Sequence, residues 1–107
     1  MTRNEWINYL TPYFVDSDYD IVPNHNDGDK SIHIHKKGTT KPQVIEIWCG
    51  DKTSIVLSKE LKEIVEKQIT LKDPADKVKG NKFHYRGVAD SLVINVCNIL
   101  LGNRIII

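Results

Sequence analysis

Pairs of aliphatic residues separated by a single residue recur through the middle of this chain and constrain its fold more than any other feature. The pairs are Ile32/Ile34, Ile45/Ile47 and Ile55/Leu57. Successive side chains of a β-strand point to opposite faces, so this alternation predicts short strands with one buried face. Glycine and proline lie between the pairs, which indicates tight connections between neighbouring strands.

We therefore predict a four-stranded antiparallel β-meander. Its strands are Tyr19–Val22, Ser31–Lys36, Gln43–Cys49 and Thr53–Leu57. A slip of one residue would turn every side chain to the other face, so common burial of the isoleucines fixes the register. Ile32 should pair with Ile47, and Ile34 should pair with Ile45. The opposite face should then carry a second set of side chains: His33, His35, Glu46, Trp48, Ser54 and Val56.

Helices are predicted before and after this meander. Thr2 and Glu5 have the spacing of a capping box, and apolar residues follow at helical intervals. Pro12 should end this first helix near Thr11 or let it restart there. A second helix should run from Lys59 to about Ile69, with Ser58 as its cap.

The sequence allows more than one prediction of secondary structure for the last third of the chain. The polar stretch Lys72–Gly87 holds a short strand at Lys82–Arg86, and residues 92–101 fit a helix or a strand, with length favouring the helix. Ile105–Ile107 should form an edge strand or a docked tail. The fold class is thus α+β, in one domain over residues 1–107. It has an N-terminal helix, a four-stranded antiparallel β-meander, and one or two C-terminal helices packed on one sheet face.

Composition narrows the class of protein. The 107 residues are 40% hydrophobic and 27% charged, with a net charge of +1, which is typical of a folded soluble domain. No apolar run approaches the roughly 20 residues that span a bilayer, so no membrane partner is expected. The first residues lack the apolar core of a signal peptide. We therefore expect a cytoplasmic protein in which Cys49 and Cys97 are reduced thiols.

Motifs for catalysis are absent from the sequence. There is no Gly-x-Ser-x-Gly elbow, no phosphate-binding glycine loop and no cysteine spacing of a zinc site. We expect no enzymatic activity, no cofactor and no metal. One alternative is a metal-dependent hydrolase, because His33 and His35 share a strand face and Glu46 lies on the neighbouring strand. Two imidazoles and a carboxylate would leave an open zinc position for water.

A second alternative is nucleic-acid binding by the stretch Lys72–Arg86. Its cationic and aromatic residues alternate, as in surfaces that follow a phosphate backbone and stack bases. The residues concerned are Lys77, Lys79, Lys82, Phe83, Tyr85 and Arg86. The competing interpretation is an ordinary loop whose aromatic side chains anchor it to the core.

The distribution of charge favours a protein partner instead. Residues 1–29 have a net charge of −5, and residues 30–107 have a net charge of +6. Such polarity can steer association and fix orientation. A tryptophan on the outward sheet face would be a typical binding hot spot. We expect a binding protein that occupies a macromolecular partner, such as an inhibitor of the immunity-protein or phage counter-defence type. The predicted contact residues are Trp48, Val56, His33, His35 and Glu46.

Overall fold

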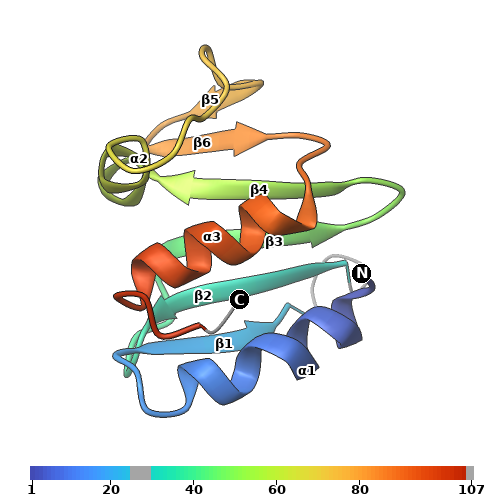
Figure 1. Ribbon diagram of the computed structural model, residues 1–107, viewed down its shortest axis with the longest axis vertical. Coiled ribbons are helices and arrows are strands. Elements are labelled where there is room, and N and C mark those ends of the chain that lie inside the picture. Colours follow the sequence, from blue (N-terminus) through green and yellow to red (C-terminus); the bar gives the residue numbers. More distant parts are fainter. Residues whose placement is uncertain (25–29, 106–107) are drawn as a thin grey trace.

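The structure is a computed structural model that describes residues 1–24 and 30–105. It shows one six-stranded antiparallel sheet in the order β1-β2-β3-β4-β6-β5, with helices α1 and α3 lying over one face (Figure 1). The elements in chain order are α1 (Arg3–Phe14), β1 (Tyr19–Pro23), β2 (Ser31–Lys36), β3 (Gln43–Cys49), β4 (Thr53–Ser58), α2 (Lys59–Val65), β5 (Lys77–Lys79), β6 (Lys82–Tyr85) and α3 (Asp90–Leu100).

The predicted register of the meander is confirmed. Ile32 pairs with Ile47 and Ile34 pairs with Ile45. On the other side of β3, Ile55 lies opposite Ile47. All five isoleucine side chains are fully buried, against α1, α2 and α3. We call this side of the sheet the helix-covered face.

The sheet has two strands beyond the predicted meander: β6, at the position of the short strand predicted at Lys82–Arg86, and β5, which was not predicted. The stretch after α2 returns to the sheet and pairs β6 with β4, and β5 then pairs with β6. This pairing satisfies the backbone groups that β4 would otherwise expose at an edge of the sheet. The β5–β6 turn is Gly80–Asn81, where the positive φ of Gly80 suits a two-residue hairpin loop. The remaining strands begin where predicted, and β1 and β4 each extend one residue further.

Helices α1 and α2 end at residues other than those predicted. α1 starts with the expected capping box but continues through Pro12 to Phe14, so Thr11 is not a cap. Instead, the Thr11 hydroxyl donates to the Ile7 carbonyl at 2.6 Å, in the turn where proline lacks an N–H. α2 ends at Val65, four residues short of the predicted end.

The ambiguous segment near the C-terminus is a helix. α3 buries Val93, Val96 and Cys97 on the helix-covered face. Ile105 is buried after the helix ends, and its backbone N–H donates to the Asn98 side chain. The predicted edge strand or docked tail at Ile105–Ile107 lies mostly outside the described residues. No helix in residues 1–24 and 30–105 is both long and apolar enough to cross a bilayer.

The two free cysteines are buried to different extents, and we therefore expect them to differ in reactivity. Cys97 is fully buried, and burial raises the pKa of its thiol to about 12. Cys49 is only partly buried, and burial raises its pKa less. We expect iodoacetamide to modify Cys49 in the native protein and to leave Cys97 unmodified until the chain unfolds, because the thiolate is the reacting species. Peptide mass spectrometry measures both sites, and equal labelling rates in the folded state would contradict this assignment.

Candidate functional site

The second face of the sheet carries no helix among the described residues. We call it the open face. One row of side chains runs across this face from β1 to β5, because residues that pair across neighbouring antiparallel strands point to the same face of the sheet. This row is Val22, His33, Glu46, Val56, His84 and Lys77. The structure therefore places His33, Glu46 and Val56 side by side, as the sequence predicted.

Glu46 belongs to a ring of four polar side chains on the open face. Its Oε2 atom accepts from Lys82 Nζ at 2.7 Å, and Lys82 Nζ also donates to Gln43 Oε1 at 3.2 Å. The Gln43 amide nitrogen lies 3.4 Å from His33 Nδ1, and His33 Nε2 lies 3.9 Å from Glu46 Oε1. The cation from β6 compensates the carboxylate, so Glu46 can be buried in the ring.

The same carboxylate also orients the tryptophan of the site. Trp48 Nε1 donates to Glu46 Oε1 at 3.3 Å, and the Trp48 side chain is partly buried. A fixed indole loses little side-chain entropy when a partner docks on it. The neighbouring Val56 is only 3% exposed, since the longer Glu46 and His84 side chains flank it. Val56 therefore packs beneath the site and is not a contact residue, whereas Val22 is an exposed apolar residue of this face.

A groove of about 640 Å³ opens beside the ring, at the end of the sheet formed by β3, β4 and the β5–β6 hairpin. Its walls include Glu46, Lys79, Lys82 and His84. Lys79 lies directly opposite Lys82 across the hairpin. Like charges in such cross-strand pairs repel each other. An acidic group bound in the groove would relieve this repulsion.

His84 lies in this groove as a neutral imidazole at pH 7. Partial burial is the largest cause of its lowered pKa, and the cationic side chains of Lys77, Lys82 and Arg86 lower it further, against the opposing effect of Glu46. A bound anion would act in the opposite direction and favour the protonated form.

The lowered pKa of His84 makes stability depend on pH. The unfolded chain takes up a proton near the ordinary value of 6.5, whereas the folded chain does so only at lower pH. Unfolding therefore takes up protons in this window, so the free energy of unfolding falls as the pH drops through 6.5. We expect His84→Gln to lose less stability than the wild type between about pH 7.5 and about pH 5.5 in urea denaturation. Equal losses for the two proteins would contradict the role given to His84.

The predicted metal triad is not assembled. Glu46 lies opposite His33, but a β-bulge shifts the register after Ile34, and His35 therefore lies opposite Gln43. His35 is buried, and its Nδ1 atom is 3.3 Å from the Lys36 carbonyl oxygen. Across residues 1–24 and 30–105, no three His, Cys, Asp or Glu side chains are grouped as a metal site would require.

The predicted basic and aromatic set is split between the two faces. Lys77, Lys79 and Lys82 lie on the open face with His84. Tyr85 is buried on the helix-covered face opposite Ile55, and Phe83 packs there with the Lys62 ammonium 4.7 Å from its ring centroid. The lysines therefore have no aromatic neighbours from this stretch for stacking bases. This outcome supports the alternative that the aromatic residues anchor the stretch to the core.

One member of the ring was not among the predicted site residues. Gln43 joins His33 to Lys82, and it does so because the bulge on β3 turns it onto the open face. The sequence near position 43 does not indicate a bulge, since Val44 continues the β-branched pattern of the strand.

Comparisons of this chain with protein-family models, curated proteins and solved structures gave no match. The function has therefore to be inferred from the site itself.

Proposed function

We propose that this chain is a small binding protein that occupies a protein partner with an acidic surface, through the open face of its sheet. The observation that carries the proposal is the preorganised ring at Glu46 on the open face, which no helix covers in the described part of the chain. The ring holds Trp48 in place and presents Lys82 beside the groove. Binding sites of this kind combine a rigid aromatic anchor with a polar surround.

Charge supports an acidic partner. The β5–β6 hairpin presents Lys77 and Lys79 on the open face, where both residues are exposed. Residues 30–107 carry a net charge of +6, and this excess favours association with acidic surfaces. A protein is favoured over a nucleic acid because Phe83 and Tyr85 lie on the other face of the sheet.

The biological form of this activity that we propose is inhibition. A single small domain that covers a partner's working surface needs no catalytic group of its own. Immunity proteins and phage counter-defence inhibitors act in this way, and we place this chain with them as a cytoplasmic protein. The two free thiols, Cys49 and Cys97, fit a reducing compartment.

Affinity capture with matched variants tests the proposal. Wild-type protein, a Trp48→Ala/Lys79→Glu variant and a Lys67→Glu control are immobilised and exposed to nuclease-treated native lysate. Circular dichroism first establishes that all three are folded. We expect a protein that the wild type and the control retain and the open-face variant releases. The purified partner should form a complex that weakens as the salt concentration rises, since exposed charges are screened.

Three results would contradict the proposal. Retention of no protein at micromolar concentration would remove its basis, and equal retention by the open-face variant would exclude this surface. Capture that disappears with nuclease treatment, together with salt-dependent retention on purified DNA or RNA, would favour the nucleic-acid alternative instead.

A further inference from the structure

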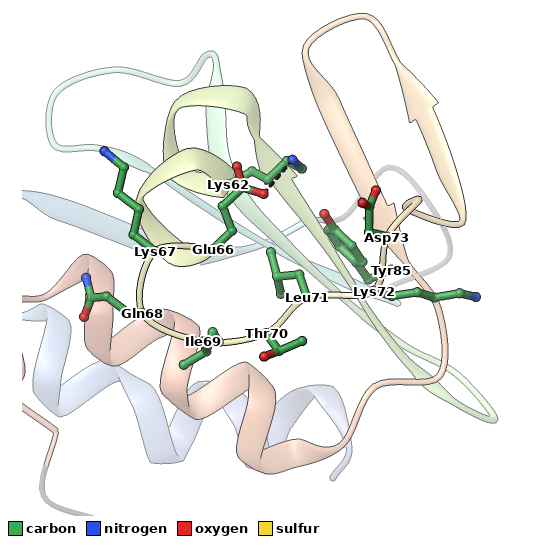
Figure 2. A pocket seen from close by; sticks show the side chains of 10 residues that line it. All are labelled: Lys62, Glu66, Lys67, Gln68, Ile69, Thr70, Leu71, Lys72, Asp73 and Tyr85. Atoms are coloured by element: carbon green, nitrogen blue, oxygen red, sulfur yellow. Dashed lines mark hydrogen bonds and ion pairs between the residues drawn. The ribbon is translucent and has the colours of Figure 1, made fainter.

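A second cavity lies on the helix-covered face and has no role in the proposed function. Its volume is about 500 Å³, and it opens between the end of α2, the segment 66–73 and Tyr85 of β6 (Figure 2). Volumes between about 300 and 1,000 Å³ are typical of sites for small molecules. We call it the Tyr85 pocket.

The phenol of Tyr85 is an unsatisfied polar group in this pocket. The side chain is 2% exposed, and its hydroxyl has no hydrogen-bond partner among the described residues. Figure 2 shows the hydroxyl pointing toward the ion pair of Lys62 and Glu66. Buried tyrosine hydroxyls usually find a partner, because leaving one unpaired costs its desolvation energy. The Tyr85 hydroxyl therefore has unused hydrogen-bonding capacity beside the cavity.

The charged groups around the phenol indicate what kind of ligand fits. Lys62 Nζ is compensated by Glu66 Oε2 at 2.9 Å, so this cation is already paired. The side chains of Lys67 and Lys72 extend away from the cavity (Figure 2), and Lys72 pairs with Asp76. The carboxylate of Asp73 lines the pocket and engages no hydrogen bond or ion pair within the described part of the chain.

The phenol itself remains neutral and can accept a hydrogen bond. Burial is the main cause of its raised pKa, and the Glu66 and Asp73 carboxylates raise it further, while Lys62 opposes them. Asp73 and Tyr85 line the same cavity, and neither the exposed Asp73 carboxylate nor the buried Tyr85 hydroxyl has a hydrogen-bond partner among the described residues. A single ligand group that donates hydrogen bonds to both the Asp73 carboxylate and the Tyr85 hydroxyl oxygen must carry several N–H or O–H bonds.

We infer that the Tyr85 pocket binds a small primary ammonium ion. Its three N–H donors can reach the Asp73 carboxylate and the Tyr85 hydroxyl oxygen and retain one for water or Glu66. The aliphatic part of the ligand packs against Leu71, whose side chain points into the space beside Tyr85 (Figure 2). The charge of the ion is balanced by the carboxylate that otherwise has no partner.

Titrations followed by ¹⁵N–¹H NMR test the chemistry of the ligand. The probes are n-butylammonium, n-butanol and butyrate, which share one carbon chain and differ in the polar group. We expect saturable shifts at the amides of Thr70, Leu71 and Asp73 with n-butylammonium, and much smaller shifts with the other two. Equal binding of butanol or butyrate, or no saturable binding of the amine, would overturn the inference. An additional titration with an Nα-acetyl-lysine amide distinguishes a lysine side chain of a peptide from a free amine as the natural source.

Two variants test the atoms that are assigned to the ligand. Tyr85→Phe removes only the hydroxyl, and Asp73→Asn removes only the charge. Each should weaken n-butylammonium binding by about tenfold or more, as expected for the loss of a hydrogen bond to a charged group. Asp51→Asn, at an exposed turn between β3 and β4, is the matched control and should bind like the wild type. Unchanged affinity in both pocket variants would overturn the inference, whatever the result with the open face.

Discussion

Replacement of Ile47 by alanine is expected to lower the free energy of unfolding by about 2–5 kcal/mol. Ile47 is fully buried at the centre of the sheet, between Ile32 on β2 and Ile55 on β4. Removal of its methyl groups loses buried apolar surface and leaves a cavity that the paired strands cannot close. The total stability of a domain this size is about 5–15 kcal/mol, so the loss would be a large fraction of it.

Urea denaturation followed by circular dichroism measures this loss as a lower midpoint with an unchanged slope. Val22→Ala is the matched control, because Val22 is exposed on the open face and its truncation should change stability by less than about 0.5 kcal/mol. If the two variants lost similar stability, the helix-covered face would not be the main core, and the assignment of the open face would fail with it.

Reversal of charge at Lys77 and Lys79 is expected to weaken binding of the captured partner protein by about tenfold or more. Both residues are exposed on β5, at the end of the open face beside the groove. Exposed charges act mainly through steering, so the loss should appear in the association rate more than in the dissociation rate. Surface plasmon resonance of Lys77→Glu/Lys79→Glu at two salt concentrations measures both rates.

The control for this variant carries the same change in net charge elsewhere. Lys52→Glu/Lys67→Glu alters two exposed lysines that do not line the groove. It should change the association rate much less, and high salt should reduce the difference between the two variants. If both double variants lost affinity equally, only the net charge of the chain would matter, and the open face would have no specific role.

The alternation of the isoleucines was sufficient to predict the centre of the sheet. Because the side-chain period of a strand is two, a slip of one residue would separate Ile32 and Ile34 from Ile45 and Ile47, and the structure has the predicted register that pairs them. The same argument placed His33 and Glu46 on one face. It could not detect the bulge on β3 opposite Ile34 and His35, since the extra residue, Val44, is β-branched like its neighbours in the strand.

The sequence by itself thus determined which side chains of the central strands point to the helix-covered face, because removing this alternating apolar surface from water is the main favourable contribution to folding. Tertiary structure decided how the last third of the chain joins the sheet. The strand Lys77–Lys79 is exposed throughout and has no apolar signal, so only backbone pairing with β6 defines it. Pairing of β6 with β4 brings Lys82 to Glu46 and buries Tyr85 beside α2. Such contacts between distant segments depend on backbone hydrogen bonds that every residue except proline can form, and local sequence therefore does not specify them.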